Sequence, residues 1–421
     1  MKKVVIWVML LTFFASAAPV NLFSSLSQSS ADNQDGQSDA MVGEYNVGIK
    51  DELAVGAKVN INLPSKSIET IVTNIWDDGN HSNDTYGFSA LSEDKRNILS
   101  VTSSNKTIIG SISTTEKMYR FISVSDSNIT MKSIPITNFK DHDDSYIDDV
   151  NENFLNLTDN NTSDNLSDGN IITYSVIVAY DHSFSSELGD NQSLIANYMQ
   201  TLERETNEAY ENSNVNARVK IVHNYLTNYQ KQGSFQKDMT YFKNTSNQYT
   251  QELHRLRNQY AADIMILLLG NGYVSCGLAQ KIGADESQAF AIVKSSCGIG
   301  YYTFGHEIGH LFGARHIVYR DPSDVPFSFG HGYCSPDADW RTVMAYGCQN
   351  HAYPRIQQWS NPNVSINGIP TGTQNLEYNA KVLNIRARYI SNFRVPVPLP
   401  NKGNEVAWLI PAIYYPMLLA L

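Results

Sequence analysis

Cysteine is scarce in this sequence, and the first 275 residues contain none. The four cysteines lie in the second half, at Cys276, Cys297, Cys334 and Cys348. The first half therefore offers no thiol that could cap a metal ion. An even number of cysteines favours disulfides if the chain reaches an oxidising compartment.

Charge and long hydrophobic runs are also limited. Charged residues make up 17% of the 421 residues, and the net charge is −11. Lysine and arginine form no basic stripe, so nucleic acid is a poor candidate partner. Neither apolar terminus reaches the roughly 20 residues that span a membrane as a helix. The length is sufficient for two domains.

The N-terminus has the three parts of a secretory signal. Lys2 and Lys3 precede an apolar run at 4–14, and residues 15–17 supply the small side chains of a cleavage site. We therefore expect residues 1–17 to be a signal peptide and the protein to be secreted or held at the cell surface. An uncleaved anchor is the alternative, although the apolar run is short for one.

The C-terminal residues 396–421 form a proline-containing linker and a hydrophobic tail. The apolar stretch Val406–Leu421 has 16 residues and is interrupted by Pro411 and Pro416. A removable sorting tail or short anchor would attach the protein to a membrane or cell surface. A plain hydrophobic tail that packs on the domain or stays disordered is equally open.

The most informative stretch is His306-Glu307-x-x-His310-x-x-Gly313-x-x-His316. Residues four apart lie on one face of a helix, so two imidazoles can reach one metal ion. Gly313 can take the left-handed conformation that ends a helix, and the turn then brings His316 back as a third ligand. Three neutral imidazoles and an open fourth position are typical of catalytic zinc. We predict one Zn²⁺ ion bound by His306, His310 and His316.

Glu307 follows the first ligand and is predicted to be catalytic. Zinc lowers the pKa of its water from about 15.7 to roughly 7 and polarises a substrate carbonyl. Glu307 would take the proton of the zinc-bound water and pass it to the leaving amine. An ordinary amphipathic core helix is the alternative, because Phe304, Ile308 and Leu311 form an apolar stripe. That stripe is compatible with a separate ligand face.

Composition divides the rest of the chain. Residues 18–150 are predicted to be a β-rich domain, because short alternating runs are separated by turn residues. Residues 151–170 are acidic and rich in Asn, which indicates a linker. A zinc-capping role for the nearby His142 or a neighbouring carboxylate is the alternative to a solvated acidic segment. Residues 171–395 alternate strands and helices, which predicts an α/β domain with a mixed sheet.

Within residues 171–395 the pattern predicts individual elements. The expected strands are 174–180, 217–225, 264–269, 277–280 and 289–293, and the expected helices are 194–210, 252–262, the zinc helix and 378–393. For the cysteines we favour the pairs Cys276–Cys297 and Cys334–Cys348, each of which closes a short loop beside the proposed site. Zinc ligation by cysteine is the alternative.

The ligand motif, together with Met344, resembles the metzincin clan of zinc endopeptidases. In that clan a methionine turn forms an apolar floor beneath the three histidines, and Thr342–Tyr346 is similar to it. Three further stretches resemble the bacterial reprolysin-like family, which includes the peptidyl-Asp metalloendopeptidases: Pro326–Tyr333, Trp359–Pro362 and Asn392–Arg394. The resemblance covers roughly residues 171–394.

The resemblance implies a five-stranded mixed sheet and an N-terminal propeptide. The edge strand, formed by Gly277, Leu278, Ala279 and Gln280, would bind an extended substrate as an added strand. The implied protein is a secreted, zinc-dependent endopeptidase made as a proenzyme, with protein or peptide substrates. A catalytically inactive surface or binding protein of the same fold is the alternative. The sequence does not decide whether calcium is required.

Two side-chain roles also follow from the resemblance. Tyr346 would reach the metal or the oxyanion, as a tyrosine two residues after the methionine does in some metzincins. Acidic residues near the scissile bond are implied, and Arg315 or Arg341 could attract them. Many reprolysins follow the third histidine with aspartate, whereas this chain has Ile317.

Overall fold

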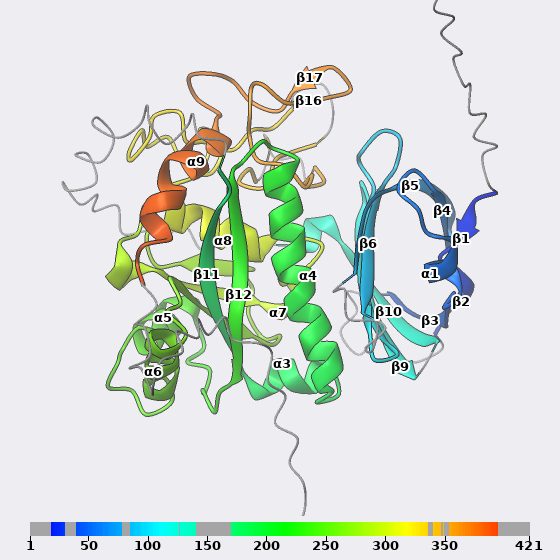
Figure 1. Ribbon diagram of the computed structural model, residues 1–421, viewed down its shortest axis with the longest axis horizontal. Coiled ribbons are helices and arrows are strands. Elements are labelled where there is room, and N and C mark those ends of the chain that lie inside the picture. The colour runs from blue at the N-terminus through cyan, green and yellow to red at the C-terminus, as the bar shows by residue number, and fades with distance from the viewer. Residues whose placement is uncertain are drawn as a thin grey trace, which may run out of the picture.

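The computed structural model describes residues 18–29, 39–77, 85–125, 127–139, 170–335, 340–346, 348 and 353–394. These residues form two domains that lie side by side (Figure 1). The expected signal peptide at 1–17, the tail at 396–421, His142, and the expected linker at 151–170 except Asn170 lie outside the described residues.

The N-terminal domain is a ten-stranded sheet in the order β1-β4-β5-β6-β7-β8-β9-β10-β3-β2. Neighbouring strands are antiparallel except for the parallel pair β1 and β4. The strands are β1 (Val20–Asn21), β2 (Phe23–Gln28), β3 (Asp39–Tyr45), β4 (Lys58–Leu63), β5 (Lys66–Asp77), β6 (Tyr86–Leu91), β7 (Ile98–Ser104), β8 (Thr107–Ser113), β9 (Lys117–Ser125) and β10 (Asn128–Pro135).

This sheet curls so that its two edge strands, β1 and β2, are separated by a single residue of the chain. Strand β1 pairs with β4 at one edge, and β2 pairs with β3 at the other. Only Leu22 separates β1 from β2, and it is fully buried. The strands alternate, so that β4 buries Val59, Ile61 and Leu63 in a core enclosed by the curled sheet. The short helices α1 (Ile49–Glu52) and η1 (Ile136–Asn138) complete the domain.

The second domain contains a five-stranded sheet in the order β12-β11-β13-β15-β14. Four strands are parallel, and the edge strand β14 is antiparallel to β15. The mixed α/β content expected from the sequence is therefore present. The strands are β11 (Ile172–Tyr180), β12 (Ala217–Leu226), β13 (Ile264–Leu269), β14 (Gly277–Ala279) and β15 (Phe290–Lys294).

Helices cover both faces of this sheet. One face packs against α4 (Gln192–Glu211), α8 (Thr303–Phe312) and α9 (Asn379–Ile390), and the other against α5 (Phe235–Phe242) and α6 (Gln251–Gln259). Strand β13 is buried on both faces, because it contributes alternate side chains to the two cores. Figure 1 shows α4 between the five-stranded sheet and the N-terminal domain.

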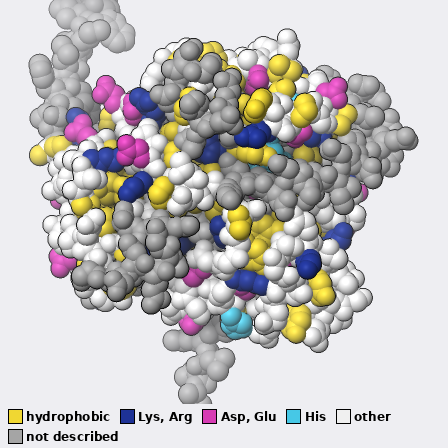
Figure 2. Space-filling model, turned by 180° about the vertical axis from the view of Figure 1, so that it is seen from behind, with side chains coloured by type: hydrophobic (Ala, Val, Ile, Leu, Met, Phe, Trp, Pro, Cys, Tyr) yellow, Lys and Arg dark blue, Asp and Glu magenta, His cyan; other side chains and the backbone are white. Residues whose placement is uncertain are grey.

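The remaining elements are short. They are α3 (His182–Glu187), η2 (Glu286–Gln288), α7 (Ser295–Gly298), β16 (Ser365–Ile366) and β17 (Ile369–Pro370). Most of the chain between α8 and α9 is irregular. No helix among the described residues combines the length and the hydrophobicity needed to cross a membrane. On the face shown in Figure 2, basic and acidic side chains are interspersed.

The surface of α4 that faces the N-terminal domain is polar. Ser89 donates a hydrogen bond to Glu208 (2.9 Å), and the hydroxyls of Thr102 and Thr201 are 2.7 Å apart. The Arg204 guanidinium stacks on Trp76, 3.2 Å from the ring centroid. A surface with this composition would stay hydrated if the two domains separated, unlike the apolar core of one domain.

Glu205 lies at the centre of the same interface. Its carboxylate accepts hydrogen bonds from Ser111 (3.0 Å) and from the backbone N–H of Gly300 (2.8 Å). Burial raises the pKa of Glu205 to about 7, and the neighbouring Glu208 adds to the rise, while Arg204 and the two hydrogen bonds oppose it. The docked state therefore holds a proton that the unfolded chain releases near its ordinary pKa of 4.5.

We predict that Glu205 makes the protein less stable as the pH rises from about 4.5 to 7. In this range the unfolded chain loses the proton while the folded chain keeps it, so the free energy of unfolding falls. The loss amounts to about 3 kcal/mol at about 1.4 kcal/mol per pKa unit. Glu205→Gln should flatten this fall in thermal melts at pH 4.5 and 7.5. Glu211→Gln, an exposed change on the same helix, should leave it unchanged, and equal slopes for both variants would contradict the assignment.

Candidate metal centre

Helix α8 carries two of the three proposed ligands and is fully buried. It ends at Gly313, whose φ of 106° lies in the left-handed region. The N–H of Gly313 donates to the carbonyl of His310, and the N–H of Ala314 to that of Gly309 (2.8 and 2.9 Å). These two bonds satisfy the last helical carbonyls and reverse the chain toward His316.

The structure brings His306, His310 and His316 together. Their Nε2 atoms are 3.0 to 3.2 Å apart, and all three side chains are buried. These histidines are the only group of three metal-ligating side chains found among the described residues. Three nitrogens at about 2.0–2.1 Å from one tetrahedral zinc ion would be about 3.3 Å apart. The observed triangle fits such an ion to within a few tenths of an ångström.

The hydrogen bonds of the rings show which nitrogen carries the proton. Nδ1 of His306 lies 2.8 Å from the carbonyl oxygen of Val343, and Nδ1 of His310 lies 2.9 Å from that of Ala314. A carbonyl oxygen only accepts, so each Nδ1 must donate its proton. Each Nε2 then directs a lone pair toward the common centre. Converging lone pairs repel one another unless a cation lies between them, which makes this donor set suited to a metal ion.

His316 is positioned by backbone pairing with a distant segment. The N–H of Arg315 donates to the carbonyl of Gly330 (2.7 Å), and the N–H of Gly332 to that of Arg315 (3.0 Å). Between these bonds, Nδ1 of the buried His331 donates to the carbonyl of His316 (2.8 Å). Burial lowers the pKa of His331, so the neutral ring is favoured.

Met344 and Trp359 pack beneath the ligand helix. A Cβ at Gly309 would lie 2.9 Å from the Met344 sulfur and 2.6 Å from the Trp359 ring. Only a glycine permits this approach. The same turn supplies the Val343 carbonyl to His306, so the methionine segment supports the ligands by packing and by a hydrogen bond. Tyr346, two residues later, places its ring edge-on to His316 with centroids 4.2 Å apart.

Glu307 lies directly beside the edge strand. A Cβ at Gly277 would come within 2.3 Å of a Glu307 carboxylate oxygen and 2.8 Å of Thr303. Strand β14 therefore crosses the first turns of α8 at the position of this carboxylate. Leu278 and Ala279 continue the strand, while Gln280 follows it and donates its N–H to the carbonyl of Phe290 (2.9 Å).

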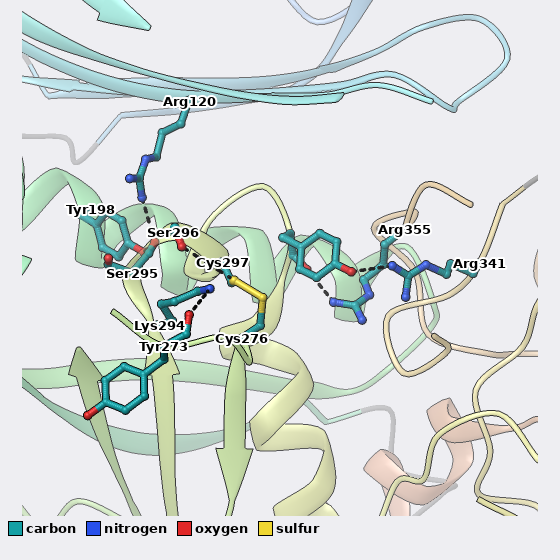
Figure 3. The surroundings of a disulfide bond; sticks show 11 residues. Arg120, Tyr198, Tyr273, Cys276, Lys294, Ser295, Ser296, Cys297, Arg341 and Arg355 are labelled. Atoms are coloured by element: carbon teal, nitrogen blue, oxygen red, sulfur yellow. Dashed lines mark hydrogen bonds between the residues drawn. A yellow bond between two sulfur atoms is a disulfide. The ribbon is translucent and has the colours of Figure 1, made fainter. Parts of the chain in front are cut away.

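The two disulfides are those that the sequence favoured. Cys276 is bonded to Cys297 and Cys334 to Cys348, with Cα–Cα distances of 5.5 and 5.8 Å. The first joins the residue before β14 to α7, just ahead of the ligand helix. Figure 3 shows this bond with Lys294 and Tyr273 on one side and Arg341 and Arg355 on the other.

The two arginines considered for acidic substrates differ in their surroundings. Arg315 forms an ion pair with Asp321 (2.7 Å), and both side chains are largely buried. Arg341 donates to the carbonyl of Ala345 (2.6 Å), next to the methionine turn, and to the hydroxyl of Tyr301 (2.7 Å). Arg341 therefore joins the methionine turn to the residue two positions before α8, and it is buried like Arg315.

Sequence reasoning gave His331 and Tyr301 no role, although both are part of the site. His331 belongs to a stretch that carried the family resemblance, but its contact with His316 depends on tertiary pairing. Tyr301 precedes the ligand helix by two residues, and the aromatic pair Tyr301–Tyr302 was the only signal. Burial of both residues against distant segments could not be inferred from local spacing.

Comparison with known proteins gives one family match and several relatives. A family model described as metallo-peptidase family M12 matches residues 170–360. A peptidyl-Asp metalloendopeptidase of Stenotrophomonas maltophilia is 36% identical over 311 residues, which cover 72% of this chain and 72% of the relative. One of Xanthomonas campestris is 40% identical over 219 residues, covering 52% and 51%.

The longer alignment includes part of the N-terminal domain. Residues 170–421 amount to about 60% of the chain, which is less than the 72% aligned. A solved structure titled as a chaperone–substrate complex overlays with a TM-score of 0.44 at 16% identity, covering 68% of this chain and 39% of that one. A similarity this low supports no conclusion about fold.

We predict that His316→Ala abolishes tight metal binding. Two imidazoles cannot replace three in a closed triangle, and the buried Nε2 atoms of His306 and His310 would take up solvent or a proton instead. Metal content of the purified protein, measured by mass spectrometry, should fall from about one ion per chain to near zero. The control is His223→Ala, at a half-buried histidine stacked on Tyr260, and metal loss in this variant would contradict the ligand assignment.

Proposed function

The chain belongs to the bacterial reprolysin-like metallopeptidases of family M12 and is a metalloendopeptidase; on this premise we propose that it binds one catalytic zinc ion, uses Glu307 as general base and acid, and is exported as a proenzyme. Protein or peptide substrates follow from the family. The observation that carries the proposal is the buried triangle of imidazole nitrogens, with the Glu307 carboxylate beside the edge strand β14.

Zinc is proposed as the ion because the three ligand atoms are all imidazole nitrogens, which suit it. When bound, zinc supplies an acidified water and polarises the scissile carbonyl. His306 and His310 keep their tautomers through the carbonyls of Val343 and Ala314, so their basic nitrogens stay directed at the ion.

Glu307 is positioned to move a proton. It follows His306 on α8 and lies against the backbone of Gly277, where a substrate strand would begin. In the proposed mechanism its carboxylate accepts a proton from the attacking water and delivers it to the leaving amine nitrogen. Tyr346 is proposed to donate its hydroxyl to the developing oxyanion, since its ring contacts that of His316.

Strand β14 is proposed to bind substrate by β-augmentation. Among the strands that the structure describes it is the edge of the sheet, with β15 as its neighbour. An extended peptide can add to the other side through main-chain hydrogen bonds at Gly277, Leu278, Ala279 and Gln280. This mode reads a run of backbone and not a chain terminus, in keeping with an endopeptidase.

The N-terminal domain is proposed to be a pro-domain that is released by cleavage between residues 140 and 170. Its contact surface on α4 is polar and would stay hydrated after release. Export through a signal peptide at residues 1–17 is part of the same proposal. Both disulfides suit an oxidising compartment outside the cytoplasm. An inactive binding protein is disfavoured by the presence of Glu307, which such a protein would not need.

Cleavage beside aspartate is proposed because the relatives are named peptidyl-Asp metalloendopeptidases. Arg341, whose guanidinium contacts the Ala345 carbonyl and the Tyr301 hydroxyl, is the proposed source of attraction. Arg315 is a weaker candidate because Asp321 already balances its charge.

Glu307→Gln should retain the metal and lose turnover. The amide preserves shape but cannot accept a proton, so the rate of peptide hydrolysis should fall roughly 100- to 10,000-fold. Hydrolysis of a quenched fluorescent peptide and metal content should be measured on the same preparation. The matched control is Glu286→Gln, at a remote glutamate on the surface. Turnover of the Glu307 variant at the wild-type rate would refute the mechanism.

A peptide that contains one Asp should be cleaved faster than its Asn twin. The two side chains have nearly the same shape, so the difference reports charge recognition. A tenfold ratio in kcat/KM corresponds to about 1.4 kcal/mol of discrimination. We expect at least roughly that ratio, with the cut adjacent to Asp in mass spectra of the products. Equal rates for the twins would remove the proposed preference but leave the peptidase activity standing.

A further inference from the structure

The orientation of β14 defines the two sides of the proposed cleft. The strand runs from Cys276 toward Gln280, and an antiparallel substrate would run the opposite way. Glu307 lies beside Gly277, at the start of the strand. Substrate residues that follow the scissile bond, which occupy the primed side, would therefore lie beyond Gly277, toward Cys276.

Tyr301 lies at this end of the cleft, where three segments meet. It belongs to a buried apolar cluster with the disulfide Cys276–Cys297. It precedes α8 by two residues, and its hydroxyl accepts a hydrogen bond from Arg341. The same guanidinium binds the Ala345 carbonyl of the methionine turn (2.6 Å). Tyr301 is thus adjacent to the edge strand, the ligand helix and the methionine turn.

The ring of Tyr301 is covered by the end of the N-terminal domain. Phe139 stacks on it with centroids 4.1 Å apart and an angle of 16° between the planes. Ile134 and Met118 pack against the same cluster. Phe139 follows η1 and is the last residue described before the segment that is proposed to be cut. With this cover in place Tyr301 is 3% exposed.

The other contacts of Tyr301 hold the ring in place from the second domain. The Arg355 guanidinium lies 4.4 Å from the ring centroid and donates to the Tyr301 carbonyl (2.8 Å). Figure 3 shows Arg341 and Arg355 side by side beyond the disulfide, while Arg120 descends from the N-terminal sheet. Arg120 donates to the carbonyl of Ser295 (2.8 Å), the first residue of α7. The ring is therefore fixed by its own domain and covered by the other.

We propose that the Tyr301 ring is a primed-side substrate subsite for a planar apolar side chain, and that Phe139 keeps the full-length chain latent by occupying it. Phe139 supplies the evidence for the ligand class, because it is a flat hydrocarbon ring stacked on the face that a substrate would meet. The inference rests on the proposed endopeptidase function and on strand addition at β14. It makes latency a matter of blocked substrate binding at this subsite.

Removal of Phe139 should open the subsite in the uncut chain. The experiment uses full-length protein that carries Glu307→Gln, so that peptides bind without being cleaved. Fluorescence anisotropy would measure the affinity for a labelled, extended peptide with one Phe and for its Ala twin. Phe139→Ala should tighten binding of the Phe peptide roughly two- to tenfold, which is the size of one aromatic contact. The Ala peptide should gain less.

Two further variants separate the subsite from general loosening of the domains. Asn138→Ala, at the exposed neighbour of Phe139, should leave both affinities unchanged. Tyr301→Leu in the Phe139→Ala chain should abolish the preference for Phe, while Tyr301→Phe, which keeps the ring, should retain it. Metal content serves as the check that each variant has folded.

Three outcomes would overturn the inference: no tightening with Phe139→Ala, equal tightening for both peptides, or the same gain with Asn138→Ala. Absence of peptide binding by every variant would also overturn it. None of these results depends on turnover, which is tested separately in a chain with an intact Glu307. The subsite can therefore fail while the peptidase function stands.

Discussion

The second domain depends on three imidazole nitrogens that converge on one point. The carbonyl acceptors of two rings place their protons on Nδ1, so the Nε2 lone pairs face inward, about 3 Å from each other and from Nε2 of the third ring. The inward-facing lone pairs repel one another unless a cation is present, and the surrounding structure holds the three rings in position. The left-handed Gly313 turns the chain, and pairing with Gly330 and Gly332 fixes the third histidine.

The contact between the domains differs in character from either core. Carboxylates, hydroxyls and amides of α4 face the N-terminal sheet, with few apolar side chains among them. Glu205 tolerates this burial through two hydrogen bonds and a pKa near 7. A surface of this kind can be covered or bare without a large hydrophobic cost. The apolar part of the contact lies in two places: Ile98 and Ile109 of the N-terminal sheet join the core of the second domain, and Phe139 stacks on Tyr301.

Local pattern made part of the fold predictable. The apolar run at 264–269 coincides with β13, and the expected helices at 194–210 and 378–393 match α4 and α9 to within three residues at each end. Helices α3 and α5 were missed because six and eight residues give too few turns for a clear period. Strand β2 was missed because its sequence, Phe-Ser-Ser-Leu-Ser-Gln, is polar and resembles a loop.

The candidate site was likewise predictable only where its residues are close in sequence. The three histidines were found because four-residue spacing, a glycine and a third histidine are close in sequence. Contacts made across the fold, such as His331 with His316 or Phe139 with Tyr301, have no local signature. The curl of the N-terminal sheet is also non-local, and it has a consequence for the signal-peptide cut that the sequence predicts. Only Ala18 and Pro19 lie between the expected cut and β1. Strands β1 and β2 are consecutive in the chain, and they pair with β4 and β3 at opposite edges of the sheet. The first residues after this cut are therefore those that connect the two edges of the sheet. Loss of even a few of them would leave the two edges unconnected.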